Sequence, residues 1–159
     1  MTKVLSLQPI GIIHTPFVKQ EGTPIQPALA EGAEGWIELH EQYLPALKDL
    51  DGFERIWLLY WFDRVGEVKL EVVPYLDTVM RGLFATRAPA RPNPIGISSV
   101  RLLGIEKNIL RVADVDILDG TPLLDIKPYC PKFDAYEVQR VGWLEGTGQK
   151  RPLADDRFV

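Results

Sequence analysis

Hydrophobic residues come in short runs along the chain, and glycine, proline and polar turns separate these runs. Runs that alternate with polar residues, or that are wholly apolar and rich in branched or aromatic side chains, predict β-strands. The 13 prolines and 13 glycines are spread along the chain, which keeps the predicted strands short. The expected strands cover residues 7–14, 35–40, 55–62, 69–75, 82–86, 95–106, 109–118 and 122–129.

One segment, residues 40–53 (HEQYLPALKDLDGF), has the spacing of a helix instead. Leu44, Leu47 and Leu50 recur three positions apart, as on one face of a helix. Pro45 is tolerated in a first helical turn, and Gly52 follows the end of the pattern. The sequence therefore predicts one short helix here.

Many short strands with close turns and a single helix predict a mainly β, single-domain protein. Residues 95–106 and 109–118 should form a long hairpin, because only Lys107 and Asn108 separate them. We expect a closed or nearly closed β-barrel with antiparallel or mixed strands over residues 1–146. Residues 147–159 are expected to be a polar C-terminal tail.

Composition is that of an ordinary globular protein, with 46% hydrophobic and 25% charged residues. The net charge of -4 argues against a surface that is basic throughout, so contact with a polynucleotide would need a local patch. Cys130 is the single cysteine, which excludes an intrachain disulfide and a cysteine metal cluster. The chain has no signal-peptide pattern and no run of roughly 18 apolar residues, so a cytoplasmic protein without a membrane helix is expected.

Several common site motifs are missing from the chain. It has no glycine fingerprint for dinucleotides, no phosphate-binding P-loop and no Gly-x-Ser-x-Gly nucleophile motif. His14 and His40 stand alone, without a second histidine at the spacing of metal ligands, and Cys130 is best interpreted as a packed thiol. No metal site is expected.

Two segments carry a chemical signal. Residues 87–96, RAPARPNPIG, cannot form a helix, so this stiff loop would hold Arg87 and Arg91 in fixed positions that suit an anionic or carboxylate-bearing ligand. Residues 116–129, DILDGTPLLDIKPY, follow Asp114, and strand alternation would place Asp114 and Asp116 on one face. Each segment also has a plainer interpretation: the arginines could merely decorate the surface, and the aspartates could belong to an ordinary solvent-facing hairpin.

Together these segments resemble the TsaA-like family, also called TrmO, of tRNA methyltransferases. The family's marks are present as FATRAPARPNPIG at residues 84–96 and DILDGTPLLDIKPY at residues 116–129. The stretches PIGIIHTPF, IQPAL and LDGFERIWLLYWF are also similar to the family, and the resemblance extends from about residue 8 to 144. It implies a β-barrel enzyme that transfers a methyl group from S-adenosylmethionine to N6 of threonylcarbamoyladenosine, beside the tRNA anticodon. It also implies a homodimer with the cofactor near the subunit interface.

The resemblance implies a set of cofactor-binding positions. These are Gln26, Pro27 and Ala28, Asp63 and Arg64, Arg87, Ile97, and the run Asp114, Val115, Asp116 and Ile117. Three of them depart from the family pattern. Ala28 replaces a glycine, and Asp63 and Arg64 stand where many relatives have a histidine and an amide residue. The chain is also expected to lack the additional C-terminal domain of longer bacterial members.

The reaction needs further groups. The acceptor nitrogen is urea-like and a poor nucleophile, so a carboxylate such as Asp63 or Asp119 is expected to act as the general base. Aromatic faces, with Phe17, Phe62 and Phe84 as candidates, could stabilise the sulfonium. Arg81, Arg91 and Lys132 are the expected contacts to tRNA phosphates.

Three alternatives stay open at this point. The chain could be a methyltransferase with a different small or RNA substrate. It could be a barrel that binds S-adenosylmethionine as a sensor and transfers nothing. It could also be a β-barrel interaction module whose prolines and arginines dock a partner. Cofactor binding separates the last alternative from the others, and methyl transfer into tRNA separates the leading hypothesis from all three.

Overall fold

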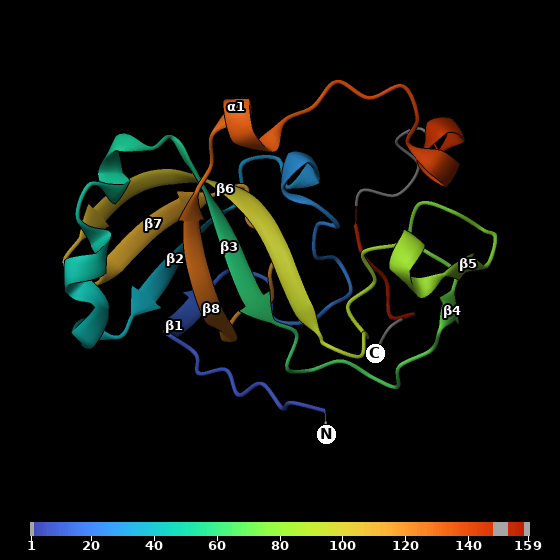
Figure 1. Ribbon diagram of the computed structural model, residues 1–159, viewed down its shortest axis with the longest axis horizontal. Coiled ribbons are helices and arrows are strands. Elements are labelled where there is room, and N and C mark those ends of the chain that lie inside the picture. The colour runs from blue at the N-terminus through green and yellow to red at the C-terminus, as the bar shows by residue number, and fades with distance from the viewer. Residues whose placement is uncertain (1, 148–152, 158–159) are drawn as a thin grey trace.

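A computed structural model describes residues 2–147 and 153–157, and its centre is a closed antiparallel barrel (Figure 1). The strand order around the barrel is β1-β2-β7-β6-β3-β8, so the predicted mainly β barrel is confirmed. Its strands are β1 (Gly11–His14), β2 (Glu34–Leu39), β3 (Arg55–Trp61), β6 (Ile95–Glu106), β7 (Ile109–Ala113) and β8 (Thr121–Pro128). The predicted hairpin across Lys107 and Asn108 joins β6 to β7.

The barrel forms because alternate residues of its strands are apolar and point inward. In β3, Ile56, Leu58 and Tyr60 are buried between more exposed neighbours. The same alternation in β6 turns Ser98 and Val100 inward, and both are almost completely buried. The interior is therefore a packed core, with side chains filling the space that the strands enclose.

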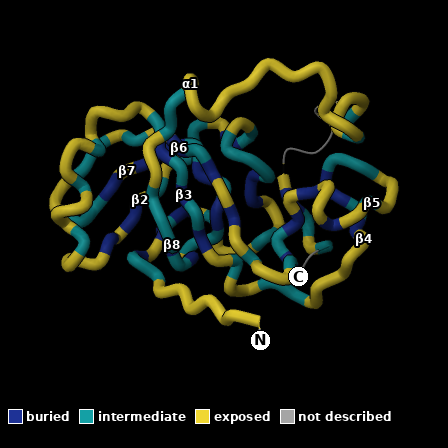
Figure 2. The backbone as a smooth tube through the Cα atoms, in the orientation of Figure 1, coloured by how far each residue is buried: buried dark blue, intermediate teal, exposed yellow. Residues whose placement is uncertain are grey.

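A smaller lobe lies beside the barrel, to the right in Figure 1. It holds the two-stranded sheet of β4 (Glu71–Val72) and β5 (Arg81–Gly82). Figure 2 shows a second group of buried positions here, separate from those of the barrel. This second core cluster consists of Val72, Tyr75, Leu83, Ala88 and Ala154.

The described part of the C-terminal tail packs against this lobe. Leu153 forms a β-bridge with Pro24, and Ala154 belongs to the second core cluster. The Arg157 guanidinium donates to the carbonyl oxygens of Val73 and Pro74. Residues 153–157 thus complete the lobe, although their composition is that of a polar tail.

Several predicted strands are longer than the observed ones, and of the strand expected at residues 7–14 only Gly11–His14 forms. The expected strands at residues 69–75 and 82–86 shrink to the two-residue strands β4 and β5, and Leu83–Ala85 is a 3-10 helix. The expected strand at 109–118 ends at Ala113, because Asp114 adopts a left-handed backbone with φ of 67° that a strand cannot continue. The prediction of extended structure was wrong in these places.

The single short helix predicted at residues 40–53 is helical as expected but is divided into two pieces. The segment forms two 3-10 helices, Glu41–Leu47 and Leu50–Gly52. Pro45 lies inside the first, and Asp49, with φ of 68°, separates the two. The one α-helix in the described residues is α1 (Pro131–Asp134), and further 3-10 helices are Pro27–Leu29 and Gly142–Gly146. Within the described ranges, no helix has the length and apolar character needed to span a membrane.

Candidate functional site

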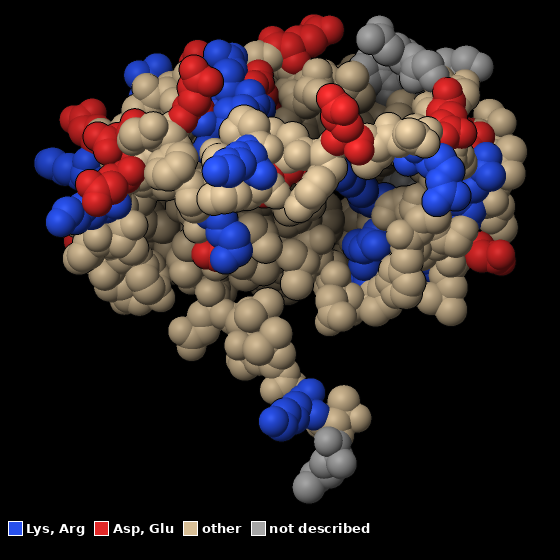
Figure 3. Space-filling view, turned by 45° about the horizontal axis from the view of Figure 1, so that its top comes forward, with Lys and Arg blue, Asp and Glu red and all other residues tan. Residues whose placement is uncertain are grey.

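A cavity of about 710 Å³ lies between the barrel and the lobe, and both signal-bearing segments line it. RAPARPNPIG contributes Arg87 and Arg91, and the segment at 116–129 contributes Asp116 and Thr121. The space-filling view shows basic side chains gathered around the hollow between the two parts (Figure 3). The closed sheet brings these distant segments together, because β6 begins directly after the proline-rich loop and β8 follows the aspartate segment.

The proline-rich loop is held from within by one of its own arginines. Arg91 Nη1 donates to the carbonyl oxygens of Thr86 and Ala88, both at 3.0 Å. Its guanidinium also lies 5.8 Å from the centre of the exposed Phe84 ring. Arg87 is placed differently: its Nη1 donates to Gln26 Oε1 at 2.6 Å, across the cavity wall. The loop therefore has one arginine that fixes its backbone and one that is available to a ligand.

A hydrogen-bonded chain of three side chains reaches from the barrel interior to the cavity. Tyr60 Oη lies 2.8 Å from Ser98 Oγ, and Ser98 Oγ donates to Asp116 Oδ1 at 2.6 Å. Tyr60 and Ser98 are 3% and 1% exposed, whereas Asp116 is partly accessible and lines the cavity. Loss of water around the carboxyl raises the pKa of Asp116 to about 7, although the Ser98 hydrogen bond and the charge of Arg87 oppose the rise.

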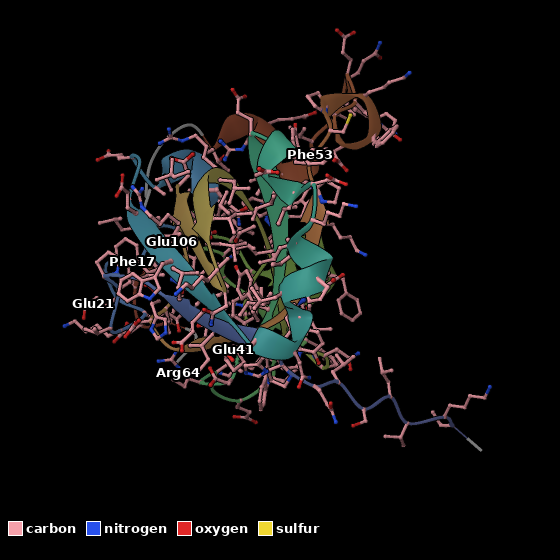
Figure 4. The ribbon with its side chains drawn as sticks, turned by 90° about the vertical axis from the view of Figure 1, so that its left-hand side faces the viewer. Phe17, Glu21, Glu41, Phe53, Arg64 and Glu106 are labelled. Atoms are coloured by element: carbon pink, nitrogen blue, oxygen red, sulfur yellow. The ribbon has the colours of Figure 1, made fainter. Side chains whose placement is uncertain are left out.

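A second carboxylate lines the cavity beyond the end of β3. Asp63 Oδ1 lies 3.2 Å from Arg64 Nε, and Arg64 Nη2 donates to the carbonyl oxygen of Asp119 at 2.8 Å. Figure 4 shows Arg64 on the same side of the barrel as Phe17, and the backbone of Asp119 also bonds to Phe17. Arg64 thus ties the end of β3 to the turn before β8.

The carboxylate of Asp119 is engaged elsewhere. Its Oδ1 accepts from the backbone N–H of Thr15 at 3.1 Å and lies 3.4 Å from His14 Nδ1. Asp119 is not among the residues that line the cavity. The side chain therefore fixes the turn before β8 against the segment that follows β1.

Asp114 and Asp116 do not share a face, so that prediction was wrong. Asp114 Oδ2 accepts from Arg55 Nη1 at 3.1 Å and from Arg101 Nε at 3.0 Å. Asp116, two residues later, bonds to Ser98 at the cavity. Strict alternation fails because the backbone turns at Asp114 and no strand continues through Asp116.

The cavity collects part of the expected cofactor set. Lining residues from that set are Gln26, Asp63, Arg64, Arg87, Ile97, Asp116 and Ile117. Pro27 and Ala28 belong to the 3-10 helix directly after Gln26, and Val115 is wholly buried in the barrel core. Phe62 and Phe84 also line the cavity, whereas Phe17 packs against the barrel core.

The three expected RNA contacts do not lie together at the cavity. Arg91 lines it, but Arg81 lies 2.7 Å from Asp77 Oδ2 and 5.7 Å from the centre of the Trp143 ring. Lys132 is exposed on α1. The described residues contain no group of three or more His, Cys, Asp or Glu side chains placed to hold a metal ion.

Sequence reasoning missed several residues that line the cavity or hold its side chains in place. Tyr60 and Ser98 had a usable signal: each is a polar residue at an inward position of a strand whose other inward residues are apolar. Trp143, Leu144 and Ala154 also line the cavity. Nothing in their local pattern indicates it, because only the fold of the lobe brings these three residues to the cavity.

Known proteins resemble this chain over most of its length. A family model described as the tRNA-methyltransferase O N-terminal domain matches residues 12–135. A probable S-adenosyl-L-methionine-binding protein of Pyrococcus abyssi is 52% identical over 153 residues, 96% of this chain and 83% of the relative. The tRNA (adenine(37)-N6)-methyltransferase of Homo sapiens is 30% identical over 138 residues, 82% of this chain and 31% of that protein.

A solved structure extends the likeness to three dimensions. The crystal structure of TrmO from Pseudomonas aeruginosa matches with a TM-score of 0.75 at 40% sequence identity. The match covers 89% of this chain and 63% of the TrmO chain, so this chain spans less than two thirds of the solved protein.

Proposed function

Because the chain belongs to the tRNA-methyltransferase O family, we propose that it is an S-adenosylmethionine-dependent tRNA methyltransferase. The proposed acceptor is N6 of adenosine 37, beside the anticodon, where the base carries a threonylcarbamoyl group. One observation carries the proposal: the family's two motif segments, far apart in the sequence, line a single cavity of about 710 Å³. That volume lies within the usual range of small-molecule sites, roughly 300–1,000 Å³.

The chemistry of the cavity fits S-adenosylmethionine. Arg87 offers a guanidinium to a carboxylate, and apolar residues such as Ile25 and Ile97 offer a surface for the adenine. The aromatic ring of Phe62 and the carboxyls of Asp63 and Asp116 suit a sulfonium. We assign cofactor binding to the expected residues that line the cavity, with Gln26 fixing Arg87 through their hydrogen bond.

Positioning is the main work left to the protein. When bound, S-adenosylmethionine supplies an activated methyl group, whose transfer needs the acceptor nitrogen in line with the carbon–sulfur bond. The loop held by Arg91 is stiff, and β3 and β6 are fixed by the barrel, so the walls are preorganised on both sides. A preorganised cavity lowers the entropy lost when both reactants are aligned.

The tRNA is expected to approach over the exposed rim of the cavity. The Phe84 side chain is exposed at the rim, and the guanidinium of Arg91 lies over its ring. An exposed aromatic ring beside a guanidinium suits an unstacked base, since RNA recognition commonly uses such stacking. Arg81 and Lys132 remain proposed phosphate contacts away from the rim.

We further propose a homodimer in the cytoplasm, where its tRNA substrate would be met. Trp61 and Ile95 are register partners on β3 and β6, and both are exposed. Ile97, also exposed, continues this apolar strip into the cavity lining. A second copy covering the strip would close the cavity from that side, which supports a cofactor site near the subunit interface.

Calorimetric titration of S-adenosylmethionine into the cofactor-free protein, after its solution mass has been determined, tests this function. The wild type should bind with micromolar affinity, and Arg87→Ala should bind at least about tenfold more weakly, because an ion pair to the ligand is lost. Arg140→Ala is the matched control, since Arg140 is exposed and does not line the cavity.

Methyl transfer is measured next, with labelled cofactor and two tRNA preparations. One carries threonylcarbamoyladenosine at position 37 and the other carries plain adenosine there. Label should enter the modified tRNA. The affinity of the protein for tRNA should fall as the salt concentration rises. Cofactor binding without transfer would favour the sensor alternative, and absence of binding to a folded protein would refute the cofactor site itself.

A further inference from the structure

The hydrogen bonds of the Tyr60–Ser98–Asp116 chain run in one direction. A serine hydroxyl has a single hydrogen, and Ser98 donates it to Asp116 Oδ1. Tyr60 must therefore be the donor to Ser98 Oγ. Burial raises the pKa of Tyr60 well above its ordinary value, so the phenol keeps its proton. These hydrogen bonds thus hold Asp116 at the cavity, with Oδ1 accepting from Ser98 Oγ.

We propose that Asp116, positioned by Ser98 and Tyr60, is the general base that removes the proton from the acceptor nitrogen during methyl transfer. This assignment rests on the proposed function and gives one residue of that site a catalytic role. It replaces the expectation that Asp63 or Asp119 is the base. It also explains why Ser98 and Tyr60, two almost completely buried residues of the barrel, carry hydroxyl groups.

The two other carboxylates are less suited to this role. Asp63 is in an ion pair with Arg64, so a proton accepted there would disrupt that pair. Asp119 is bound to Thr15 and His14 and does not line the cavity. Among the described residues, no cationic group lies at hydrogen-bonding distance from Asp116. Its proton affinity near neutrality suits a base that must also release the proton.

The step balances in atoms and charge. The bond between the methyl carbon and sulfur breaks, and its electron pair stays on sulfur, which becomes a thioether. The lone pair of the acceptor nitrogen forms the new carbon–nitrogen bond. The nitrogen–hydrogen bond breaks, the electron pair of that bond remains on nitrogen, and the carboxylate of Asp116 takes the proton. The cationic sulfonium and the anionic carboxylate both become neutral, which a poorly hydrated cavity favours.

The charged surroundings of Asp116 set its titration. Tyr60 faces it from β3 and Arg87 from the proline-rich loop, and the positive charge of Arg87 lowers the pKa of the carboxyl. The other titratable side chains that line the cavity in the described part of the chain are Asp63, Arg64, Tyr75 and Arg91. A bound sulfonium would add a positive charge, so the single-turnover rate should rise with pH and level off at or below about 7.

The test compares the wild type with Asp116→Asn in single-turnover transfer to the modified tRNA. At saturating cofactor and pH 7, we expect the variant's rate to fall by about 100-fold or more. Calorimetric cofactor affinity should fall by no more than about tenfold, because the sulfonium loses one of the two carboxyls that face it. Asp51→Asn, an exposed aspartate in the 3-10 helix Leu50–Gly52, is the control. A variant that loses cofactor binding but transfers normally at saturating cofactor would show that Asp116 is only a ligand.

Ser98→Ala provides an independent readout. The Ser98 hydrogen bond lowers the pKa of Asp116, so its loss should move the rate profile to higher pH and let the rate recover there. Merely structural damage would lower the rate equally at every pH. A profile with an unchanged midpoint would contradict the positioning role.

A third readout needs no cofactor. The pKa of Asp116 is higher in the folded chain than in the unfolded chain, so ionisation costs the wild type stability as pH rises from about 4 to about 7. The wild-type melting temperature should therefore fall by several degrees relative to that of Asp116→Asn across this window. Above about pH 7 the difference between the two melting temperatures should stay constant.

The outcomes separate the two proposals. A wild type that binds cofactor but methylates neither tRNA refutes the proposed acceptor, and the base assignment falls with it. A wild type that methylates the modified tRNA, beside an equally active Asp116→Asn, refutes the base assignment alone. If Asp63→Asn lost methyl transfer while Asp116→Asn kept both its rate and its pH dependence, the role of general base would belong to Asp63.

Discussion

The barrel and the lobe beside it are built in different ways. The barrel is closed by paired strands, and its core includes Ile37, Leu58 and Leu123, none of which is exposed. The lobe has two strands of two residues each, and its small core depends on Ala154 from the end of the chain. Hydrogen-bonded closure gives the barrel a structure that the lobe must obtain from loops and side-chain contacts.

This difference divides the cavity into two kinds of wall. On the barrel side Tyr60 lines the cavity, and Tyr60 and Ser98, whose positions follow from strand register, hold Asp116 there. The lobe side supplies Arg87 from the proline-rich loop. Rigid elements hold reacting groups more precisely than loops do, so the barrel is suited to chemistry and the lobe to ligand capture. Substitutions in the two cores should therefore have different effects.

The largest effect is expected in the barrel core. Leu58→Ala leaves a cavity at a fully buried position of β3 and should lower the free energy of unfolding by about 3–5 kcal/mol. Cofactor affinity, measured by calorimetry at low temperature where the variant is folded, should stay close to that of the wild type. Urea denaturation gives the stability. A variant with normal stability would mean that the barrel is not the cooperative unit assumed here.

A smaller loss of stability, with a larger loss of binding, is expected in the lobe. Leu83 is 2% exposed, packs in the second core cluster and begins the 3-10 helix Leu83–Ala85 that precedes the proline-rich loop. Leu83→Ala should cost about 2–3 kcal/mol, because loops around it can partly collapse into the space. Cofactor affinity should fall about tenfold as the wall carrying Arg87 shifts. If Leu58→Ala weakened binding as much as Leu83→Ala, the proposed division between the two walls would be wrong.

The same division explains what the sequence could predict. Barrel strands have alternating or continuous apolar patterns, and the extent of β6 matched the prediction from Ile95 to Glu106. In the lobe, Leu83 lies in a 3-10 helix, and Val72 lies in a strand of only two residues. The local apolar patterns there therefore imitate longer strands than the lobe contains. Periodicity carries information only where the backbone itself is periodic.

The candidate site shows a similar limit. The proline-rich loop could be recognised as rigid from its composition, and Arg87 as a residue available to a ligand. The role of Asp116 could not be derived, because Asp114, Asp116 and Asp119 look alike in sequence. Their surroundings separate them: two arginines for Asp114, Ser98 for Asp116, and Thr15 with His14 for Asp119. Those partners come from other strands and only the fold brings them close.

Asp114 offers the smallest and most selective test of this comparison, because it lies two residues from Asp116 yet does not line the cavity. Burial alone would raise the pKa of Asp114, but the hydrogen bonds from Arg101 and Arg55 outweigh it and lower the pKa below its ordinary value of 3.8. The folded chain therefore holds this proton less tightly than the unfolded chain. The resulting stability is present above about pH 4 and is lost as pH falls through the folded pKa.

Asp114→Asn should consequently cost about 1–2 kcal/mol at pH 7, a value reduced for the partial exposure of Arg55 and Arg101. The difference from the wild type should shrink below about pH 4, where the wild type loses the same interaction. Urea denaturation at a series of pH values measures this, and cofactor affinity measured alongside should be unchanged. If Asp114→Asn instead weakened cofactor binding while leaving stability intact, Asp114 would act at the cavity together with Asp116. The assignment of Asp114 to the structure of the barrel alone would then be wrong.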